Sequence, residues 1–566
     1  MGSTHSPERL KALLAWFKSN DISMDKIRVS SSSSSNGLGL CIMAAKDLKL
    51  GDVVCEIPKT TVLSCKSTAI AHILEEHEIA GVLGLSLSVM FEITQGVNSP
   101  WHEYLMTMPE REDIPLFWSD TDLTELASTD LESKLAKDKI LLKADWTDNI
   151  VPILEANQDL FPPTVYSYDF FLRAMSLVTS RAFQVDAYHG DSMVPLADIF
   201  NHKTAGEHVH IESDADVCLI CGSNCECEHV MEAQDMDVDA ESLDVEDGEA
   251  PELLDESSVI GDDDDEWDDV SSENNKYESE EEDDIGDTLQ MRIIKCCSRN
   301  TEVFNTYGSH NNTTLLSRYA FTEPNNPYDI TCIPWHNIIT VLSSHLPPKH
   351  LKRVEWWQQV CESLADNDDV DITDGVLVPY FDYSGGRSAA LEGAIRIAFA
   401  PVGLYRQLRS GGSGVEVYLG QLGNKGWIVR ETREEHVHGE HCAHDHEHED
   451  EDEGEEGEGN VNAKASEEMD EEEEIDTDDS DEEDEEMPSP TASVTSSLSR
   501  QVEAISKELA VRRLTQYPTT LEQDIAELAS LGPSLSRKRF ALILRIEEKK
   551  ILKRVVDKSL DKSKTP

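Results

Sequence analysis

Basic residues and long apolar runs are scarce in this chain of 566 residues. Lys and Arg together number 48 against 113 Asp and Glu, so the formal net charge is −65. A chain this acidic does not suit direct binding to nucleic acid, because contacts to phosphate supply most of that affinity. A signal peptide and an apolar run of membrane length are both lacking, so we expect neither secretion nor a membrane span. Because its twelve cysteines are mostly scattered, we expect a reducing environment, namely the nucleus and the cytoplasm.

The negative charge is concentrated in two segments of low complexity. Residues 232–284 hold 26 acidic residues and one lysine, and residues 449–486 hold 24 acidic residues and one lysine. Their net charges of −25 and −23 leave −17 for the rest of the chain. Segments this polar cannot bury enough apolar surface to offset the entropy lost on ordering, so two long acidic disordered loops are predicted. They favour a basic protein partner, or they serve only to keep the chain soluble.

The first half of the chain combines helix and strand signals. Residues 1–35 contain a helix over 7–20 and a serine-rich linker, and their opening MGSTHS fits a short, often coincidental pattern for myristoylation of Gly2. Short β-rich runs follow within residues 36–325, separated by a mainly helical insert over about 66–180. Since each set of strands is too short for a sheet of its own, we predict that the two sets combine into one β-core.

The rest of the chain has helical periodicity. Residues 326–560 are predicted to form an all-α domain, which the second acidic loop interrupts over about 432–498. The first acidic loop, over about 230–287, interrupts the β-core in the same way. The predicted fold class is therefore α+β, with a mixed domain followed by a helical one.

Four short segments carry residue types suited to a bound ligand. The turn NGLGL at 36–40 has two glycines that let a ligand approach the backbone, without the spacing of a dinucleotide fingerprint or a P-loop. The others are TSRAF at 179–183, VPLADIFNH at 194–202 and EVFNTYGSHNNTTLLSRYAF at 302–321. Taken singly, each has an ordinary structural explanation: a hairpin turn, a structural His202, or a Tyr307 that only packs.

In this order and at these spacings, the four segments resemble a SET domain. They are similar, more narrowly, to the Rubisco large-subunit methyltransferase group, which includes fungal ribosomal-protein lysine methyltransferases. SPWHEYLMTMP at 99–109 resembles that group's helical insert, and YPTTLEQDIAEL at 517–528 resembles its C-terminal substrate-binding domain. The resemblance covers most of the chain except the two acidic segments and the serine run. It implies a SET β-core threaded as a pseudoknot, with a helical insert, followed by an all-α substrate-binding domain.

The resemblance also implies an activity and a set of site residues. The activity is transfer of a methyl group from S-adenosyl-L-methionine to a lysine of a protein, with a basic ribosomal protein as the expected substrate and the enzyme a monomer. Tyr307 would lie beside the methyl group as the catalytic residue and also contact the cofactor. The other implied cofactor contacts are a glycine turn and three polar side chains: Gly37, Leu38, Gly39, Arg181, Asn201 and His202.

The chemistry of the reaction favours a tyrosine at this position. Displacement at a sulfonium methyl group needs a neutral amine, whereas free lysine has a pKa near 10.4. A narrow dry channel and a neighbouring positive charge both disfavour the ammonium form. Held geometry can then remove roughly 7–11 kcal/mol of a barrier. A rigid phenol such as Tyr307 can orient the amine, and no metal is required.

Some residues depart from the pattern of the group, and alternatives stay open. Asn300 and Ala320 stand where glycines are usual, which affects turn geometry more than chemistry. A related subgroup methylates protein histidine and carries a tryptophan where this chain has Ala197, which favours lysine as the acceptor here. A protein-histidine methyltransferase remains one alternative. The other is a non-catalytic acidic chaperone or binding module for a basic protein.

A cysteine-rich segment precedes the first acidic loop. It has the pattern C-x2-C-x3-C-x-C-x-H, and dense thiolates of this kind can bind zinc tetrahedrally. The weak zinc candidates are four cysteines: Cys218, Cys221, Cys225 and Cys227. The alternative is a reduced, metal-free cysteine-rich loop, and the pattern lacks a second, well-separated pair of ligands.

Overall fold

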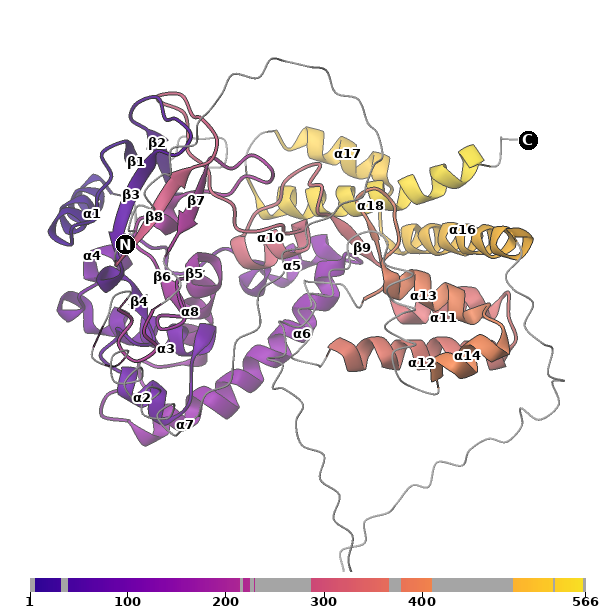
Figure 1. Ribbon diagram of the computed structural model, residues 1–566, viewed down its shortest axis with the longest axis horizontal. Helices are drawn as coiled ribbons and strands as arrows, with labels where there is room; N and C mark the ends of the chain where they lie inside the picture. Colours follow the sequence, from indigo (N-terminus) through magenta and orange to yellow (C-terminus); the bar gives the residue numbers. More distant parts are fainter. Residues whose placement is uncertain are drawn as a thin grey trace, which may run out of the picture. The chain divides into compact units, whose positions relative to one another are not determined.

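The computed structural model describes residues 6–31, 39–213, 217–223, 227, 229, 287–365, 378–409, 492–532 and 535–562 (Figure 1). The two predicted acidic disordered loops lie almost wholly outside these residues. Gly37, Leu38 and Cys225 also lie outside them. Contacts divide the chain into a first unit, Met1–Thr331 with Leu514–Leu552, and a second unit, Cys332–Arg513 with Lys553–Pro566.

The first unit contains the β-core. Its three sheets have the orders β1-β2, β3-β8-β7 and β4-β6-β5, and the described pairs are antiparallel. The strands are β1 (Ile27–Ser31), β2 (Leu40–Ala44), β3 (Val53–Pro58), β4 (Leu63–Ser64), β5 (Ala182–Gln184), β6 (Asp191–Met193), β7 (Val209–Glu212) and β8 (Thr288–Ile293). Strands from the N-terminal region therefore pair with strands that follow residue 180. This confirms the prediction that the two short sets combine into one core.

One segment joins distant parts of this core. Near residue 303 the chain pairs with β2, because the Val303 amide donates to the Ile42 carbonyl at 2.9 Å. Asn305 then forms a parallel bridge with His202, and its amide donates to the Asn201 carbonyl at 2.9 Å. The Lys203 amide donates in turn to the Asn305 carbonyl at 3.1 Å. This juxtaposition is what the predicted pseudoknot requires.

The insert between the two sets of strands is helical, as the sequence predicts. Its helices are α2 (Ala71–Glu76), α3 (Gly81–Gln95), α4 (His102–Leu105), α5 (Asp120–Leu123), α6 (Asp130–Ala144), α7 (Val151–Ala156) and α8 (Tyr168–Arg181). Helix α3 is buried over most of its length and packs against α8. Its buried Glu92 is satisfied by the hydroxyls of Thr68 and Ser99. Helix α8 begins at the side-chain cap of Ser167 and ends at Arg181, which carries that residue to the site described below.

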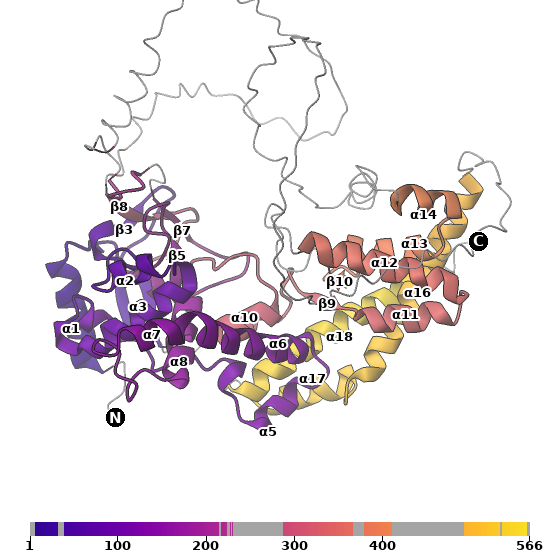
Figure 2. The same cartoon turned by 90° about the horizontal axis from the view of Figure 1, so that it is seen from below.

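Helices from both ends of the chain complete the first unit. They are α1 (Pro7–Ser19), α10 (Asn312–Tyr319), α17 (Leu521–Ser530) and the part of α18 (Arg537–Lys562) up to residue 552. Figure 2 shows α18 beside α5 and α6, where a small apolar core includes Trp118, Leu316 and Phe540. Arg537 of α18 forms ion pairs with Asp113 and Asp122. The sequence predicts one helical domain over 326–560, whereas Leu514–Leu552 make their contacts mainly in the first unit.

The second unit is mainly helical. It contains α11 (Trp335–Ser343), α12 (Pro348–Ala365), α13 (Ala389–Ala398), α14 (Val402–Arg409) and most of α16 (Ala492–Gln516). Helices α12 and α13 approach closely at Gly393, where an added Cβ would lie 2.4 Å from the Trp357 ring. The prediction of an all-α domain is wrong in one detail, because β9 (Ile330–Cys332) and β10 (Tyr380–Asp382) form a two-stranded sheet. Among the described residues, no helix combines the length and the apolar character that a membrane span would need.

Candidate active site

A cavity of about 590 Å³ lies where the chain crosses itself in the first unit. Its walls come from the start of β2, the insert and the end of α8. They also come from the two segments that cross, around residues 198–202 and around residue 307. The cavity brings together the described residues that the sequence predicts for the site: Gly39, Arg181, Asn201, His202 and Tyr307. Gly37 and Leu38 precede Gly39 and lie outside the described residues.

The phenol of Tyr307 is held at both ends of the residue. Its amide donates to Nδ1 of His202 at 2.9 Å, and its hydroxyl donates to the Phe200 carbonyl at 3.1 Å. The ring packs against Tyr319, with the ring centroids 4.7 Å apart. Gly308 follows with a φ of +114°, a conformation that L side chains rarely adopt. Burial raises the pKa of Tyr307 well above its usual value, so the phenol is neutral at physiological pH.

His202 is a neutral residue that positions Tyr307. Since Nδ1 accepts the Tyr307 amide, the neutral ring carries its proton on Nε2, which lies 2.9 Å from Oγ1 of Thr204. Burial lowers the pKa of His202 to about 4, and the residue is 3% exposed. Both ring nitrogens are therefore engaged inside the protein, so the ring can offer a ligand only its face.

Asn201 is fixed by a hydrogen bond to a carboxylate, and Gly39 by its backbone conformation. The side-chain amide of Asn201 donates to Oε1 of Glu302 at 2.7 Å, which ties the two crossing segments together a second time. Gly39 immediately precedes β2 and has a φ of +106°. A residue with a side chain would be strained there, so a glycine is required at this wall of the cavity.

Sequence reasoning missed a buried polar cluster around Arg181. The guanidinium lies 2.5 Å from Oε1 of Glu112 and 3.7 Å from Oδ2 of Asp198, and the hydroxyl of Tyr104 donates to the same Asp198 oxygen at 3.1 Å. Burial raises the pKa of Asp198 to about 6, even though Arg181 lowers it. Asp198 belongs to the ADIFNH motif, while Tyr104 and Glu112 come from the insert. A signal for Asp198 was therefore present in the sequence, whereas the other two depend on tertiary packing.

Two atoms of this cluster lack a protein partner. Nε of Arg181 and Oδ1 of Asp198 are buried without a hydrogen bond to any described residue. Both residues line the cavity. Because buried polar groups are nearly always paired, one donor and one acceptor here are suited to a polar ligand.

Backbone conformation explains why glycines are usual at two positions of the group that the sequence resembles. Asn300 and Ala320, which replace usual glycines, both have a φ of +63°. Asparagine adopts this left-handed region more easily than other residues with side chains, whereas alanine is strained in it. Leu196 is a third such residue, with a φ of +75° directly before the single helical turn Ala197–Ile199 that carries Asp198.

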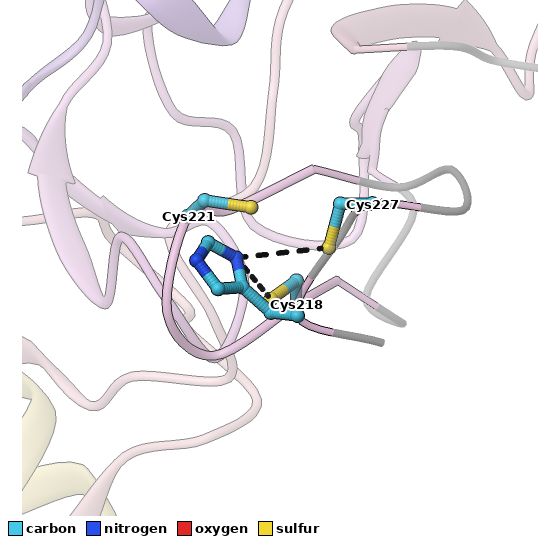
Figure 3. A group of neighbouring side chains, drawn as sticks. Cys218, Cys221 and Cys227 are labelled. Atoms are coloured by element: carbon cyan, nitrogen blue, oxygen red, sulfur yellow. Dashed lines mark hydrogen bonds between the residues drawn. The ribbon is translucent and has the colours of Figure 1, made fainter. Parts of the chain in front are cut away.

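The zinc candidates form a separate cluster. Cys218, Cys221 and Cys227 lie together with His229, and none of the four is among the residues that line the cavity (Figure 3). Cys225, the fourth predicted ligand, lies outside the described residues. The cluster precedes the first acidic segment, in the connection between β7 and β8.

Comparisons with known proteins agree with this fold. Residues 462–552 match the family model described as Rubisco LSMT substrate-binding. The chain is 27% identical over 359 residues to ribosomal lysine N-methyltransferase 3 of Saccharomyces cerevisiae, and this alignment covers 58% of this chain and 64% of that protein. It is 27% identical over 232 residues to N-lysine methyltransferase SETD6 of Mus musculus, and this alignment covers 38% of this chain and 48% of that protein. The matches thus span about half to two thirds of the length of these relatives.

A solved structure extends the likeness to the whole fold. The SET domain of LSMT bound to lysine and AdoHcy aligns with a TM-score of 0.56 at 16% identity, covering 98% of this chain and 92% of that chain. Rubisco LSMT bound to AdoMet aligns with a TM-score of 0.53 at 16% identity. The predicted α+β SET-domain fold with a helical C-terminal region is thereby confirmed. In sequence and in fold, the chain resembles the lysine methyltransferases of the LSMT group.

Proposed function

We propose that this chain is an S-adenosyl-L-methionine-dependent protein-lysine N-methyltransferase, with Tyr307 in its active site. The observation that carries the proposal is the neutral phenol of Tyr307, fixed by His202 and by the Phe200 carbonyl in a cavity shared with Gly39 and Arg181. The names of its relatives as lysine methyltransferases support the same reaction class.

The residues of the cavity fit the proposed cofactor. A volume of about 590 Å³ is in the range of sites that hold a small molecule of this size. The unpaired donor on Arg181 and the unpaired acceptor on Asp198 match the carboxylate and the ammonium group at the amino-acid end of S-adenosyl-L-methionine. When bound, this cofactor supplies a methyl group on a positively charged sulfur. The carboxylates of Asp198 and Glu112 favour a cation at this place.

The predicted residues of the cavity have different proposed roles toward the cofactor. Gly39 and Asn201 would contact the cofactor, and Arg181 would hold its carboxylate. His202 acts through Tyr307, as a positioning residue whose ring face lies against the cavity. Gly37 and Leu38 stay predictions from the sequence.

The phenol of Tyr307 can orient an acceptor amine. Its proton is donated to the Phe200 carbonyl, so its oxygen keeps lone pairs that can accept an N–H of the amine. Accepting this N–H would turn the amine lone pair away from the phenol and help to fix its direction. Burial in the cavity favours the neutral amine that the displacement needs.

The proposed substrate is a basic protein, with a ribosomal protein as the first candidate. The C-terminal match to a substrate-binding model and the name of the yeast relative both support this proposal. The acidic segments would attract such a substrate over a distance set by ionic strength. We further propose that the enzyme is a monomer of the nucleus and the cytoplasm.

Histidine as the acceptor is less well supported, because the relatives are named lysine methyltransferases. Ala197, which favours lysine in the sequence analysis, carries no weight here because it is fully buried and is not among the lining residues of the cavity. The choice of acceptor therefore rests on residues that do line the cavity, such as Tyr307 and Phe321. Mass spectrometry of the methylated peptide identifies the acceptor directly, and a methylated histidine would replace the lysine assignment.

The first experiment measures transfer of a radiolabelled methyl group from S-adenosyl-L-methionine into a ribosomal protein fraction. The Tyr307→Phe variant removes only the hydroxyl and should lower the transfer rate by about 100-fold, because the amine loses its orientation. The matched control is Tyr328→Phe, which changes an exposed tyrosine and should keep the full rate. Cofactor affinity measured by calorimetry should stay within about threefold in both variants. An unchanged rate in Tyr307→Phe would contradict the assignment.

A second experiment separates the enzyme from an acidic chaperone. Deletion of 232–284 and 449–486 should leave the turnover number unchanged while raising KM for a basic substrate, because only attraction is lost. Loss of all activity toward the basic protein, with cofactor binding intact, would favour the chaperone alternative.

A further inference from the structure

Four ligand-type side chains stand together outside the cavity. The sulfur atoms of Cys218, Cys221 and Cys227 and a ring nitrogen of His229 all lie within 4.8 Å of one another (Figure 3). Nδ1 of His229 is 3.9 Å from the sulfur of Cys218 and 3.9 Å from that of Cys227. Ligand atoms around a tetrahedral zinc ion, at bond lengths of about 2.0–2.3 Å, lie about 3.5–3.8 Å apart. The four side chains are thus close to the arrangement that a zinc ion requires.

The backbone around the first pair of cysteines forms a closed turn. The amide of Gly222 donates to the Cys218 carbonyl at 2.8 Å, and the amide of Cys218 donates to the Ser223 carbonyl at 2.8 Å. The amides of Cys221 and Ile220 point at the sulfur of Cys218, and the amide of Ser223 points at that of Cys221. Amide donors of this kind stabilise negatively charged sulfur, which is the form that binds metals.

The turn formed by residues 218–223 packs against the β-core. Gly222 has a φ of +75°, and a Cβ at this position would lie 2.5 Å from the ring of Tyr188. Tyr188 belongs to the connection between β5 and β6, where its amide donates to Asp186 at 3.0 Å. Asp186 also forms a buried ion pair with Lys59 at 2.9 Å. Contacts on the core therefore fix the position of the turn.

We propose that Cys218, Cys221, Cys227 and His229 bind one zinc ion through three thiolates and one imidazole nitrogen. Four protein ligands leave no open position, so the site is structural and takes no part in methyl transfer. Binding releases the protons of those thiols that are still protonated. The ion would join the turn at the end of the β7 connection to the residues that precede the acidic segment. Compared with the sequence prediction, this set includes His229 and omits Cys225, which lies outside the described residues.

The test is the metal content of the full-length protein expressed in zinc-supplemented medium. Because residues 434–449 are rich in histidine, zinc is counted by mass spectrometry after dialysis against a weak chelator. One zinc per chain is expected for the wild type, and less than about one tenth of that for Cys221→Ser and for His229→Ala. Cys296→Ser changes an exposed cysteine elsewhere in the chain and should keep one zinc, as should Cys225→Ser.

Cobalt titration identifies the ligands directly. The wild type should show the strong visible bands of tetrahedral cobalt and a thiolate charge-transfer band, and Cys227→Ser should weaken both. Circular dichroism and cofactor binding show whether each variant is folded. A wild type without zinc and without a cobalt spectrum would overturn the proposal, as would a disulfide between Cys218 and Cys221 in the purified protein. Loss of zinc in Cys225→Ser, with retention in His229→Ala, would overturn the role of His229.

Discussion

The Tyr307 cavity and the cysteine cluster are built in opposite ways. The cavity takes its residues from separate segments between Ser31 and Phe321, and several of its polar side chains, such as His202 and Tyr104, are buried. The cysteine cluster takes its four residues from twelve consecutive positions and is partly exposed. A site assembled from distant segments depends on the whole first unit, whereas the cysteine turn depends on its own residues and on a few contacts with the core, such as that of Gly222 with Tyr188. The two sites should therefore respond differently to the same kind of substitution.

The largest effect is expected from removing the positive charge of Arg181, one of the cations that line the cavity. Arg181→Met would leave Asp198 and Glu112 without their cation, and the exposed fractions of these two side chains are 3% and 17%. Because the Arg181 side chain is itself 22% exposed, we expect a loss of about 2–4 kcal/mol in the free energy of unfolding, below that of a fully buried pair. Urea unfolding measures it. Zinc content should stay unchanged, and a parallel loss of zinc would show that the two sites are not independent.

The next effect concerns pH, and it depends on two groups with opposite signs. The pKa of His202 falls from 6.5 to about 4 on folding, so it contributes stability above pH 6.5 that is lost as pH falls toward 4. The pKa of Asp198 rises from 3.8 to about 6, so it contributes stability below pH 3.8 that is lost as pH rises toward 6. The two contributions nearly cancel between pH 4 and 6.

Substitution of one group should expose the other. Compared with the wild type, Asp198→Asn should lose up to about 3 kcal/mol more stability as pH falls from 6.5 to 4, because only His202 then titrates. His202→Asn should show the opposite slope, and it keeps an acceptor for the Tyr307 amide. Unfolding by urea at several pH values gives both slopes. Parallel profiles for the three proteins would contradict the opposing shifts.

A smaller, local effect is expected at the cysteine turn. Gly222→Ala places a methyl group against the Tyr188 ring in a left-handed conformation, at a cost of about 1–3 kcal/mol. We expect loss of zinc together with methyl transfer within about twofold of the wild type. A matched control is Gly51→Ala, where φ is +83° but no atom lies within 4 Å of the added Cβ. That variant should keep its zinc. If Gly222→Ala abolished methyl transfer, the separation of the two sites would be wrong.

The smallest expected effect is a gain in the stability of the folded chain. Ala320→Gly relieves a left-handed alanine at the end of α10, and Asn300→Gly does the same for a residue that tolerates this conformation better. Because glycine also increases the entropy of the unfolded chain, we expect at most about 1 kcal/mol from the first and close to zero from the second. Thermal unfolding of both variants measures the difference. A destabilised Ala320→Gly would show that the alanine methyl group contributes packing.

Much of the cavity could be predicted because its residues stand in motifs with fixed spacing. Gly39, Asn201 and Tyr307 were found in this way, and the structure places them in one cavity. Tyr104 and Glu112 could not be found, because they reach the site only through the packing of the insert. Strands β9 and β10 have three residues each within a region of helical sequence, too short to give a periodic signal.

For the cysteine cluster, the sequence predicted the location but left the set of ligands open. Its residues are adjacent in the sequence, so the pattern was visible at once, but the choice among five possible ligands was not. Among the described residues, His229 directs its ring toward two of the sulfur atoms, and Cys225 lies outside them. Spacing thus identified the place of the cluster, whereas including His229 depended on the position of its ring.

The bond between His202 and Tyr307 joins residues that are 105 positions apart. About half of that separation is the acidic segment 232–284. Closing a chain loop becomes only about 0.6 kcal/mol less favourable each time its length doubles. Evolution could therefore have inserted, lengthened or shortened this segment at almost no cost in stability. The hydrogen bond that fixes the phenol should therefore depend little on the length of this segment.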